Sequence, residues 1–102
     1  METRSVGSLS VSLVGLGCNN FARKIDQEQS TEVVNAALES EITHFDTADR
    51  YGYGDHPYSG EGNSEVFLAT ALGPRRSGVT IATKFGIPLD SDPVLHRGGS
   101  RR

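Results

Sequence analysis

Stretches with the pattern of a strand alternate along this chain with stretches that have the pattern of a helix. Residues 13–17, 42–48 and 79–85 are short apolar or β-branched runs, which is the pattern of buried strands. Two helical segments, residues 26–40 and 63–72, separate these runs. Strands that alternate with helices are joined by right-handed crossovers, which make the strands parallel. The order therefore predicts an α/β fold with a parallel sheet.

A small hairpin is expected before the first of these strands. Residues 3–6 and 9–12 flank Gly7-Ser8, and glycine tolerates the positive φ of a tight turn. Residues 9–18 loosely imitate a signal peptide, because an apolar stretch ends there at a cysteine. However, the apolar residues alternate with serines, which indicates a strand, and the stretch is too short to span a membrane.

The first helix has a clear start. Asp26 can cap it, and Gln29 stands three residues later, as in a capping box. The apolar residues of this segment lie within one face that can cover a sheet, namely Val33, Val34, Ala37 and Leu38.

The second helix is expected to begin at a cap formed by Asn63 or Ser64. Gly73-Pro74 provides its end, because proline cannot continue a helix and glycine is common just past one. Residues 86–102 have no clear periodicity and are expected to form a loop.

Composition excludes several classes of partner and site. The 102 residues include 13 acidic and 10 basic ones, a net charge of -3, so neither nucleic acid nor an anionic membrane is an expected partner. The single cysteine, Cys18, cannot form an internal disulfide, and a single thiol suits a protein of the reducing cytoplasm. We expect its side chain to be a small buried one.

No metal-ligand spacing is present, and His44 is expected to have a structural or helix-facing role. A Rossmann fingerprint fails because Asn20 and Pro57 occupy the third-glycine position of the two candidate runs.

Three ionisable residues follow the ends of predicted strands. Asp46 lies near the end of the second strand, Tyr51 follows in the next loop, and Lys84 ends the third strand. Neighbouring strands lie about 4.8 Å apart, so Asp46 and Lys84 are expected to pair. An ammonium close to a phenol stabilises the phenolate, which would make Tyr51 a better proton donor. A proton donor alone reduces nothing. If the reaction is the reduction of a carbonyl group, a hydride is needed as well, and because side chains do not supply one, a nicotinamide must be bound beside Tyr51.

The signature of the aldo-keto reductases resembles three segments of this chain, His44-Phe-Asp-Thr-Ala-Asp-Arg-Tyr-Gly52, Asn63-Ser-Glu65 and Ile81-Ala-Thr-Lys-Phe-Gly86. The resemblance implies a (β/α)8 TIM barrel, of which residues 1–102 would be the N-terminal portion of the single domain: the hairpin, three strands and two helices. It also implies an NADPH-dependent oxidoreductase that reduces a small-molecule aldehyde or ketone. Asp46, Tyr51 and Lys84 match three members of the family's catalytic tetrad. The fourth, a histidine on the fourth strand, lies beyond this chain.

The resemblance also implies binding residues near these three. The expected contacts to NADPH are Gly17, Cys18 and Asp46. The expected substrate contacts are Asn19, Asn20 and Tyr51. By their position after the first strand, facing the same mouth, Asn19, Asn20 and Phe21 are candidates for contact with either the substrate or the nicotinamide. The aromatic residues Tyr53, His56 and Tyr58 either line the substrate pocket or pack their loop against the core.

Two alternatives to a working enzyme remain open at this point. Some members of the family are regulatory subunits that bind cofactor and a protein partner, and a truncated chain could lack activity altogether. A barrel of this kind needs about 250 residues, so three strands alone would leave open edges and unburied apolar helix faces, and poor solubility or self-association is expected. Glu41 departs from the family, which usually has a glycine there, and a positive φ would strain it. The oligomeric state and the substrate are not indicated.

Overall fold

The computed structural model describes residues 1–87, and within them strands and helices alternate in the predicted order. In chain order the elements are β1 (Thr3–Val6), β2 (Leu9–Ser12), β3 (Gly15–Gly17), α1 (Gln27–Glu39), β4 (His44–Asp46), α2 (Asn63–Leu72), the 3-10 helix η1 (Gly73–Gly78) and β5 (Thr80–Ala82). The three core strands are shorter than predicted, because each predicted run extends into a loop. Beyond Ile87, the loop predicted for residues 86–102 lies outside the described residues.

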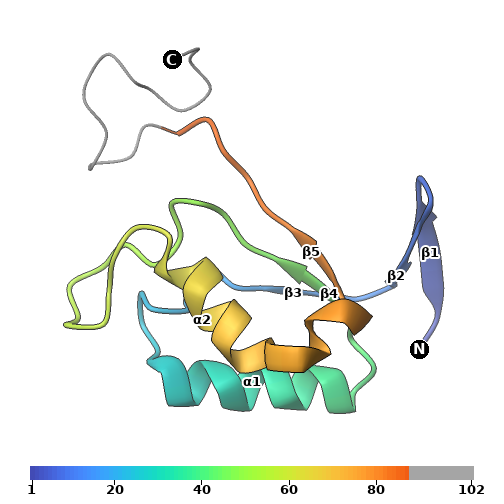
Figure 1. The fold of residues 1–102 in the computed structure, drawn as a ribbon, viewed down its shortest axis with the longest axis horizontal. Coiled ribbons are helices and arrows are strands. Elements are labelled where there is room, and N and C mark those ends of the chain that lie inside the picture. Colours follow the sequence, from blue (N-terminus) through green and yellow to red (C-terminus); the bar gives the residue numbers. More distant parts are fainter. Residues whose placement is uncertain (88–102) are drawn as a thin grey trace.

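Strands β3, β4 and β5 form a parallel sheet in that order. The register pairs Gly15 with His44, and it aligns Gly17, Asp46 and Ala82 across the three strands. Their carboxyl ends therefore meet at one edge of the sheet, where the loops that follow them come together. Helices α1 and α2 lie side by side on one face of this sheet (Figure 1).

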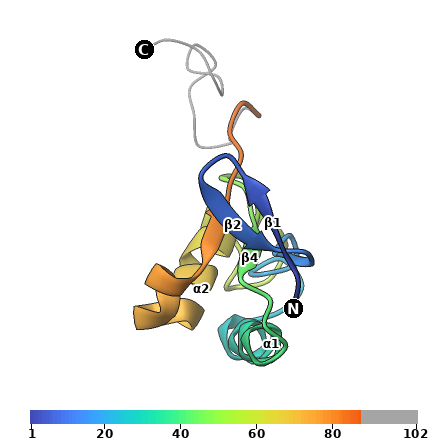
Figure 2. The ribbon, with the colours of Figure 1, turned by 90° about the vertical axis from the view of Figure 1, so that its right-hand side faces the viewer.

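The N-terminal hairpin forms a separate antiparallel pair, β1 with β2 (Figure 2). Its last residue, Ser12, accepts a hydrogen bond from the backbone N–H of Thr43, just before β4, at 3.0 Å. The same hydroxyl donates to the carbonyl of Val14 at 2.7 Å. The hairpin is thus attached at the amino ends of the strands, away from the edge where the strand-end loops meet.

The core lies between the sheet and the two helices. Phe45 of β4 is fully buried, and it belongs to a cluster that includes Val34 and Ala37 of α1 and Leu68, Ala71 and Leu72 of α2. The buried face of α1 is rotated slightly from the predicted one, since Ser30 is buried while Val33 is 37% exposed. Burial of this stripe holds the helices against the sheet.

The two helix starts differ in their capping. The capping box predicted for α1 is confirmed: Asp26 Oδ1 accepts from the N–H of Gln29, and the N–H of Asp26 donates to the Gln29 side chain. The cap predicted for α2 is wrong, because Gly62 occupies that position with φ of 81° and no side chain caps the helix. Ser64 is unavailable because its hydroxyl donates to a carbonyl outside the helix.

The ends of the two helices follow the sequence more closely. Helix α2 stops at Leu72 as predicted, and the chain continues through Gly73 and Pro74 as η1. Glu41, after α1, has the expected positive φ of 63°. Within residues 1–87, neither helix has the length and apolar character needed to cross a bilayer.

Candidate active site

Asp46 and Lys84 meet at the carboxyl edge of the sheet, as their positions predict. Asp46 is the last residue of β4, and Lys84 lies two residues beyond β5. Lys84 Nζ is 2.8 Å from Asp46 Oδ1, and both side chains are about half exposed. The backbone beyond β5 stays beside the loop that follows β4, because the N–H of Asp49 donates to the carbonyl of Lys84 at 3.1 Å.

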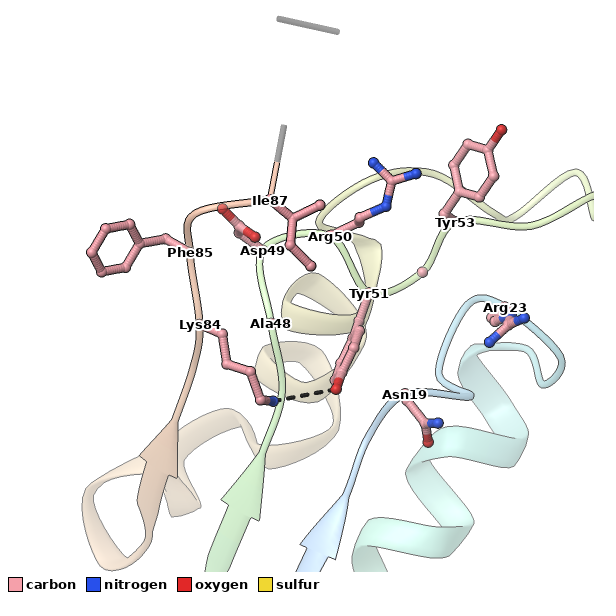
Figure 3. Close-up of a pocket in the computed structure, with 11 residues that line it drawn as sticks. Asn19, Arg23, Ala48, Asp49, Arg50, Tyr51, Tyr53, Lys84, Phe85 and Ile87 are labelled. Atoms are coloured by element: carbon pink, nitrogen blue, oxygen red, sulfur yellow. Dashed lines mark hydrogen bonds between the residues drawn. The ribbon is translucent and has the colours of Figure 1, made fainter. Parts of the chain in front are cut away.

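The ammonium of Lys84 has three hydrogen-bond donors, and the structure engages all of them. Besides Asp46, Nζ donates to the carbonyl of Thr47 at 2.8 Å and to Tyr51 Oη at 3.3 Å (Figure 3). Its hydrogen bond to the Asp46 carboxylate is the main cause that raises the pKa of Lys84 above its usual 10.5, and the bond to Tyr51 adds to it. Lys84 is therefore a cation at neutral pH.

Tyr51 accepts a hydrogen bond from Lys84 and still has its own hydrogen to donate. A phenol oxygen can do both, whereas an ammonium can only donate. The 4.6 Å distance from Nζ to the ring centroid places the cation against the phenol as well. The pair can therefore deliver a proton from Oη and stabilise the negative charge that remains on it.

The backbone of Tyr51 is held by the start of α2. Its carbonyl accepts from the N–H of Ser64 at 3.2 Å, and its own N–H donates to the carbonyl of Ala48 at 3.2 Å. The next residue, Gly52, has φ of 108°, and a Cβ there would lie 2.6 Å from the carbonyl oxygen of Gly60. The loop thus depends on glycine at the position directly after Tyr51.

A buried chain of hydroxyl groups connects the loops that form the site. Ser64 Oγ donates to the carbonyl of Cys18 at 2.7 Å, so the 2.9 Å contact between Thr47 Oγ1 and Ser64 Oγ has Thr47 as its donor, since a serine hydroxyl has one hydrogen. The carbonyl of Thr47 in turn accepts from Lys84. The network joins the loops after β3 and β4 to the first turn of α2, and through Thr47 to Lys84.

A pocket of about 430 Å³ opens beside Tyr51 and Lys84 (Figure 3). Its lining comes from the loops after all three strands of the sheet: Asn19, Arg23, Ala48, Asp49, Arg50, Tyr51, Gly52, Tyr53, Lys84, Phe85 and Ile87. The pocket is large enough for a small organic substrate. Residues 1–87 contain no group of three or more histidine, cysteine or acidic side chains that could hold a metal ion.

The residues expected to contact substrate separate into two groups. Asn19 lines the pocket beside Tyr51, whereas Asn20 does not; the Asn20 carbonyl instead accepts three backbone hydrogen bonds that fold the loop after β3. Phe21 is only 2% exposed and belongs to the core.

The aromatic residues of the long loop after β4 also separate. Tyr53 lines the pocket. His56 stacks on Tyr58 at 4.8 Å between ring centroids, and Tyr58 packs toward Phe67 of α2 at 6.2 Å. The two interpretations left open by the sequence thus apply to different residues, since Tyr53 faces the pocket while Tyr58 packs the loop against the core.

The residues expected to contact a cofactor do not share one face of the sheet. Gly17 and Asp46 line a second, shallow hollow on the face away from the helices, where a Cβ on Gly17 would meet nothing within 4 Å. Cys18 is fully buried in the core instead, with Sγ 3.7 Å from the carbonyl of Leu16. Burial raises the pKa of its thiol to about 12. Its side chain has no exposed surface with which to contact a ligand.

Of the two roles expected for His44, structural or helix-facing, the helix-facing one is wrong. Phe45 is the residue of β4 that packs against them, and His44 lines the shallow hollow with Asp46 on the opposite face. Alternation along a strand separates two faces but does not say which one a helix covers, and the apolar neighbour decided it here.

Several residues that line the pocket are not expected from their positions relative to the strand ends, namely Arg23, Asp49, Arg50, Phe85 and Ile87. Asp49 and Arg50 lie within the segment that carries the resemblance, directly before Tyr51, so their position was a usable signal. Phe85 ends the third strand predicted from the sequence, but in the structure this strand ends at Ala82 and Phe85 lies in the loop that follows. Arg23 gave no local signal, because its place depends on how the loop after β3 folds.

Comparison with known proteins agrees with this arrangement. The model of the aldo/keto reductase family matches residues 13–102. The chain is 36% identical over 85 residues to the uncharacterized oxidoreductase YrpG of Bacillus subtilis, covering 83% of this chain and 26% of that protein. It is 31% identical over 102 residues to an uncharacterized 11.2 kDa protein in the crtE 3' region of Pseudescherichia vulneris, covering 95% of this chain and 98% of that one.

Among solved structures, the holo form of the aldo-keto reductase AKR11C1 from Bacillus halodurans superposes with a TM-score of 0.73 and 30% identity. The match covers 92% of this chain and 29% of that one, so the chain spans less than a third of the length of YrpG and of this reductase. The hairpin, the three parallel strands and the two helices correspond to part of a (β/α)8 barrel, and the chain belongs to the aldo/keto reductase family.

Proposed function

We propose that this chain carries the proton-donating part of an NADPH-dependent oxidoreductase that reduces an aldehyde or ketone to an alcohol. The observation that supports this most directly is the position of the Lys84 ammonium, which lies between the Asp46 carboxylate and the Tyr51 hydroxyl, at 2.8 and 3.3 Å. A phenol beside a fixed cation is suited to general acid catalysis. Membership in the aldo/keto reductase family supports the same reaction class.

Reduction of a carbonyl adds a hydride to carbon and a proton to oxygen. A substrate carbonyl in the pocket would accept a hydrogen bond from Tyr51 Oη. As negative charge develops on that oxygen, the Oη–H bond breaks, a new O–H bond forms on the product, and the phenolate remains beside Lys84. Because the pocket is open to solvent, water can return a proton to Tyr51 after each turnover.

The hydride would come from a nicotinamide ring when NADPH is bound. The hollow that Gly17 and Asp46 share fits a flat ring, because Gly17 presents no side chain and the Asp46 carboxylate can accept from a carboxamide. These two residues would hold the nicotinamide end of the cofactor. The buried side chain of Cys18 is not part of this proposal, although its backbone lies at the start of the same loop.

The test is the substitution Tyr51→Phe in the protein, assayed by the loss of NADPH absorbance with an aldehyde. Removal of a general acid should reduce kcat by about 10²- to 10⁴-fold. NADPH affinity, measured by fluorescence titration, should change little because the ring is retained. Turnover equal to that of the wild type would exclude Tyr51 as the donor. NADPH binding by the wild type without turnover of any aldehyde or ketone would instead indicate a regulatory, cofactor-binding member of the family.

A further inference from the structure

We infer that Thr47 and Ser64 are positioning residues of the proposed reaction, although neither lines the pocket. The hydrogen bond between their hydroxyls fixes the carbonyl of Thr47, and this carbonyl holds the Lys84 ammonium beside Tyr51. The inference rests on the proposed function, because it assigns two further residues to the same proton donor. Three observations support it: the lengths of the hydrogen bonds of Lys84, the burial and bonding of Thr47, and the double attachment of Ser64.

The position of the Lys84 ammonium is set by its two shorter hydrogen bonds. Nζ is 2.8 Å from Asp46 Oδ1 and 2.8 Å from the carbonyl oxygen of Thr47, whereas it is 3.3 Å from Tyr51 Oη (Figure 3). The Asp46 side chain is half exposed and can turn about its own bonds, but the carbonyl of Thr47 belongs to the backbone. The distance from the cation to the phenol therefore depends on where the backbone places this carbonyl.

Thr47 is held through its backbone and through its side chain. It is 1% exposed, and its N–H donates to the carbonyl of Ala82 on β5 at 2.9 Å. Its hydroxyl donates to Ser64 Oγ at 2.9 Å. Because Oγ1 is attached to Cβ, this bond also restricts the backbone of Thr47. A buried hydroxyl that loses its acceptor is destabilising unless it moves to another partner, so loss of this bond would release the segment whose carbonyl faces Lys84.

Ser64 joins the supports of both groups in the proposed proton donor. Its Oγ accepts from Thr47 and donates to the carbonyl of Cys18 at 2.7 Å, while its N–H donates to the carbonyl of Tyr51 at 3.2 Å. The residue is fully buried in the first turn of α2. One residue of a helix therefore supports the backbone of the proton donor and, through Thr47, the cation beside it.

Proton transfer should be sensitive to this support because it depends on the relative position of the groups. Displacement of a catalytic group by about 1 Å can reduce a rate by about 10²-fold. Thr47 and Ser64 do not line the pocket, so a change in either should lower kcat and leave KM for the aldehyde nearly unchanged. A loss of folding stability alone would alter neither value in the protein that remains folded.

The kinetic test uses 4-nitrobenzaldehyde and two substitutions at Thr47 that differ in the hydroxyl. Thr47→Val keeps the shape and removes the hydroxyl, while Ser64 can still donate to Cys18. In this variant kcat should fall by about 10- to 100-fold with KM nearly unchanged. Thr47→Ser keeps the hydroxyl and should retain most of the wild-type kcat. Similar values of kcat for the two variants, or an unchanged kcat in Thr47→Val, would refute the inference.

Ser64→Ala has a matched control in Ser30→Ala. Both serines are fully buried near the start of a helix, and each hydroxyl donates to a backbone carbonyl at 2.7 Å. The acceptor of Ser30 is Asp26, the cap of its own helix, which does not line the pocket. Ser64→Ala should lower kcat as Thr47→Val does, and Ser30→Ala should leave it unchanged. An equal fall in both serine variants would show that the effect does not depend on contact with the site, and the inference would be wrong.

A measurement without substrate or cofactor separates this inference from the proposed function. The lysines of the chain are Lys24 and Lys84, and the ¹H–¹⁵N signal of a lysine ammonium persists when hydrogen bonds slow the exchange of its hydrogens with water. In the wild type this exchange should be slower at Lys84 than at Lys24, which is exposed. Thr47→Val should accelerate exchange at Lys84, and Ser30→Ala should not. That result supports the positioning of Lys84 even in a protein that reduces no aldehyde, whereas unchanged exchange in Thr47→Val overturns it even if turnover is rapid.

Discussion

Lys84 Nζ lies 3.3 Å from Tyr51 Oη, and its other two N–H groups donate to Asp46 and to the carbonyl of Thr47. The ammonium is therefore held by three acceptors, of which Asp46 ends β4 and Thr47 is the next residue. Such a cation stays beside the phenol and cannot easily turn toward solvent. The arrangement gives Tyr51 a permanent charged neighbour before any ligand arrives, which is the preorganisation that electrostatic catalysis requires.

The pKa of Lys84 should lie above 10.5 in the folded protein, because its hydrogen bond to Asp46 stabilises the ammonium. Since the pKa is higher in the folded than in the unfolded state, the ion pair with Asp46 contributes fully to the stability of the fold below about pH 10.5. This contribution is lost as the pH rises through the folded-state pKa. NMR titration of the ¹³Cε signal of Lys84 would measure it. In Asp46→Asn the midpoint should fall, and an unchanged midpoint would show that the carboxylate has no such effect.

Gly52→Ala should disrupt the site more than any ordinary surface substitution. A Cβ at this position would lie 2.6 Å from the Gly60 carbonyl oxygen and 2.8 Å from the Ser64 nitrogen, and φ is 108°. Relief of these contacts requires Gly52 to move away from the backbone at Gly60 and at the start of α2, and Tyr51 would move with it. We expect a loss of about 2 kcal/mol or more in the free energy of unfolding, measured by urea denaturation, together with a fall in kcat.

The matched control for this substitution is Gly78→Ala. Gly78 ends η1, its φ is not positive, and a Cβ there would meet nothing within 4 Å. The free energy of unfolding should change by less than about 0.5 kcal/mol. Similar losses for both variants would mean that the close approach of Gly52 to Gly60 and Ser64 does not limit substitution.

The thiol of Cys18 should be unreactive in the native protein. It is fully buried, and burial raises its pKa to about 12, so very little thiolate forms at neutral pH. Because Cys18 is the single cysteine, a thiol reagent such as Ellman's reagent reports on it alone. The reaction should be slow in buffer and fast in denaturant. Fast reaction under native conditions would contradict the burial of the loop after β3.

The pairing of Asp46 with Lys84 could be predicted from sequence because the positions of the two residues depend on local rules. Asp46 ends β4 and Lys84 lies two residues beyond β5, and parallel pairing of those strands brings their carboxyl ends together whatever the details of the loops. Asp26 and Gln29 form the predicted capping box for the same reason, since both partners lie within one turn of a helix.

Other features depend on contacts between distant parts of the chain. Ser64 is not a helix cap because its hydroxyl donates to the carbonyl of Cys18, which lies 46 residues earlier. Arg23 reaches the pocket because Ser59 holds the adjacent carbonyl of Ala22 across 37 residues. No window of neighbouring residues contains such pairs, so the cap of α2 and the place of Arg23 in the pocket lining could be recognised only in three dimensions.

The strand next to Asp46 contributes glycine at both positions that pair with His44 and Asp46. At Gly17 the backbone is not confined to the left-handed region, and the space that a Cβ would enter is empty. The hollow beside the Asp46 carboxylate is therefore shaped by the absence of a side chain at Gly17, while the fold itself would tolerate a methyl group there. A single substitution at Gly17 can thus adjust the depth of this hollow without changing the contacts among Asp46, Lys84 and Tyr51, which makes Gly17 a natural starting point for redesigning what this scaffold accommodates.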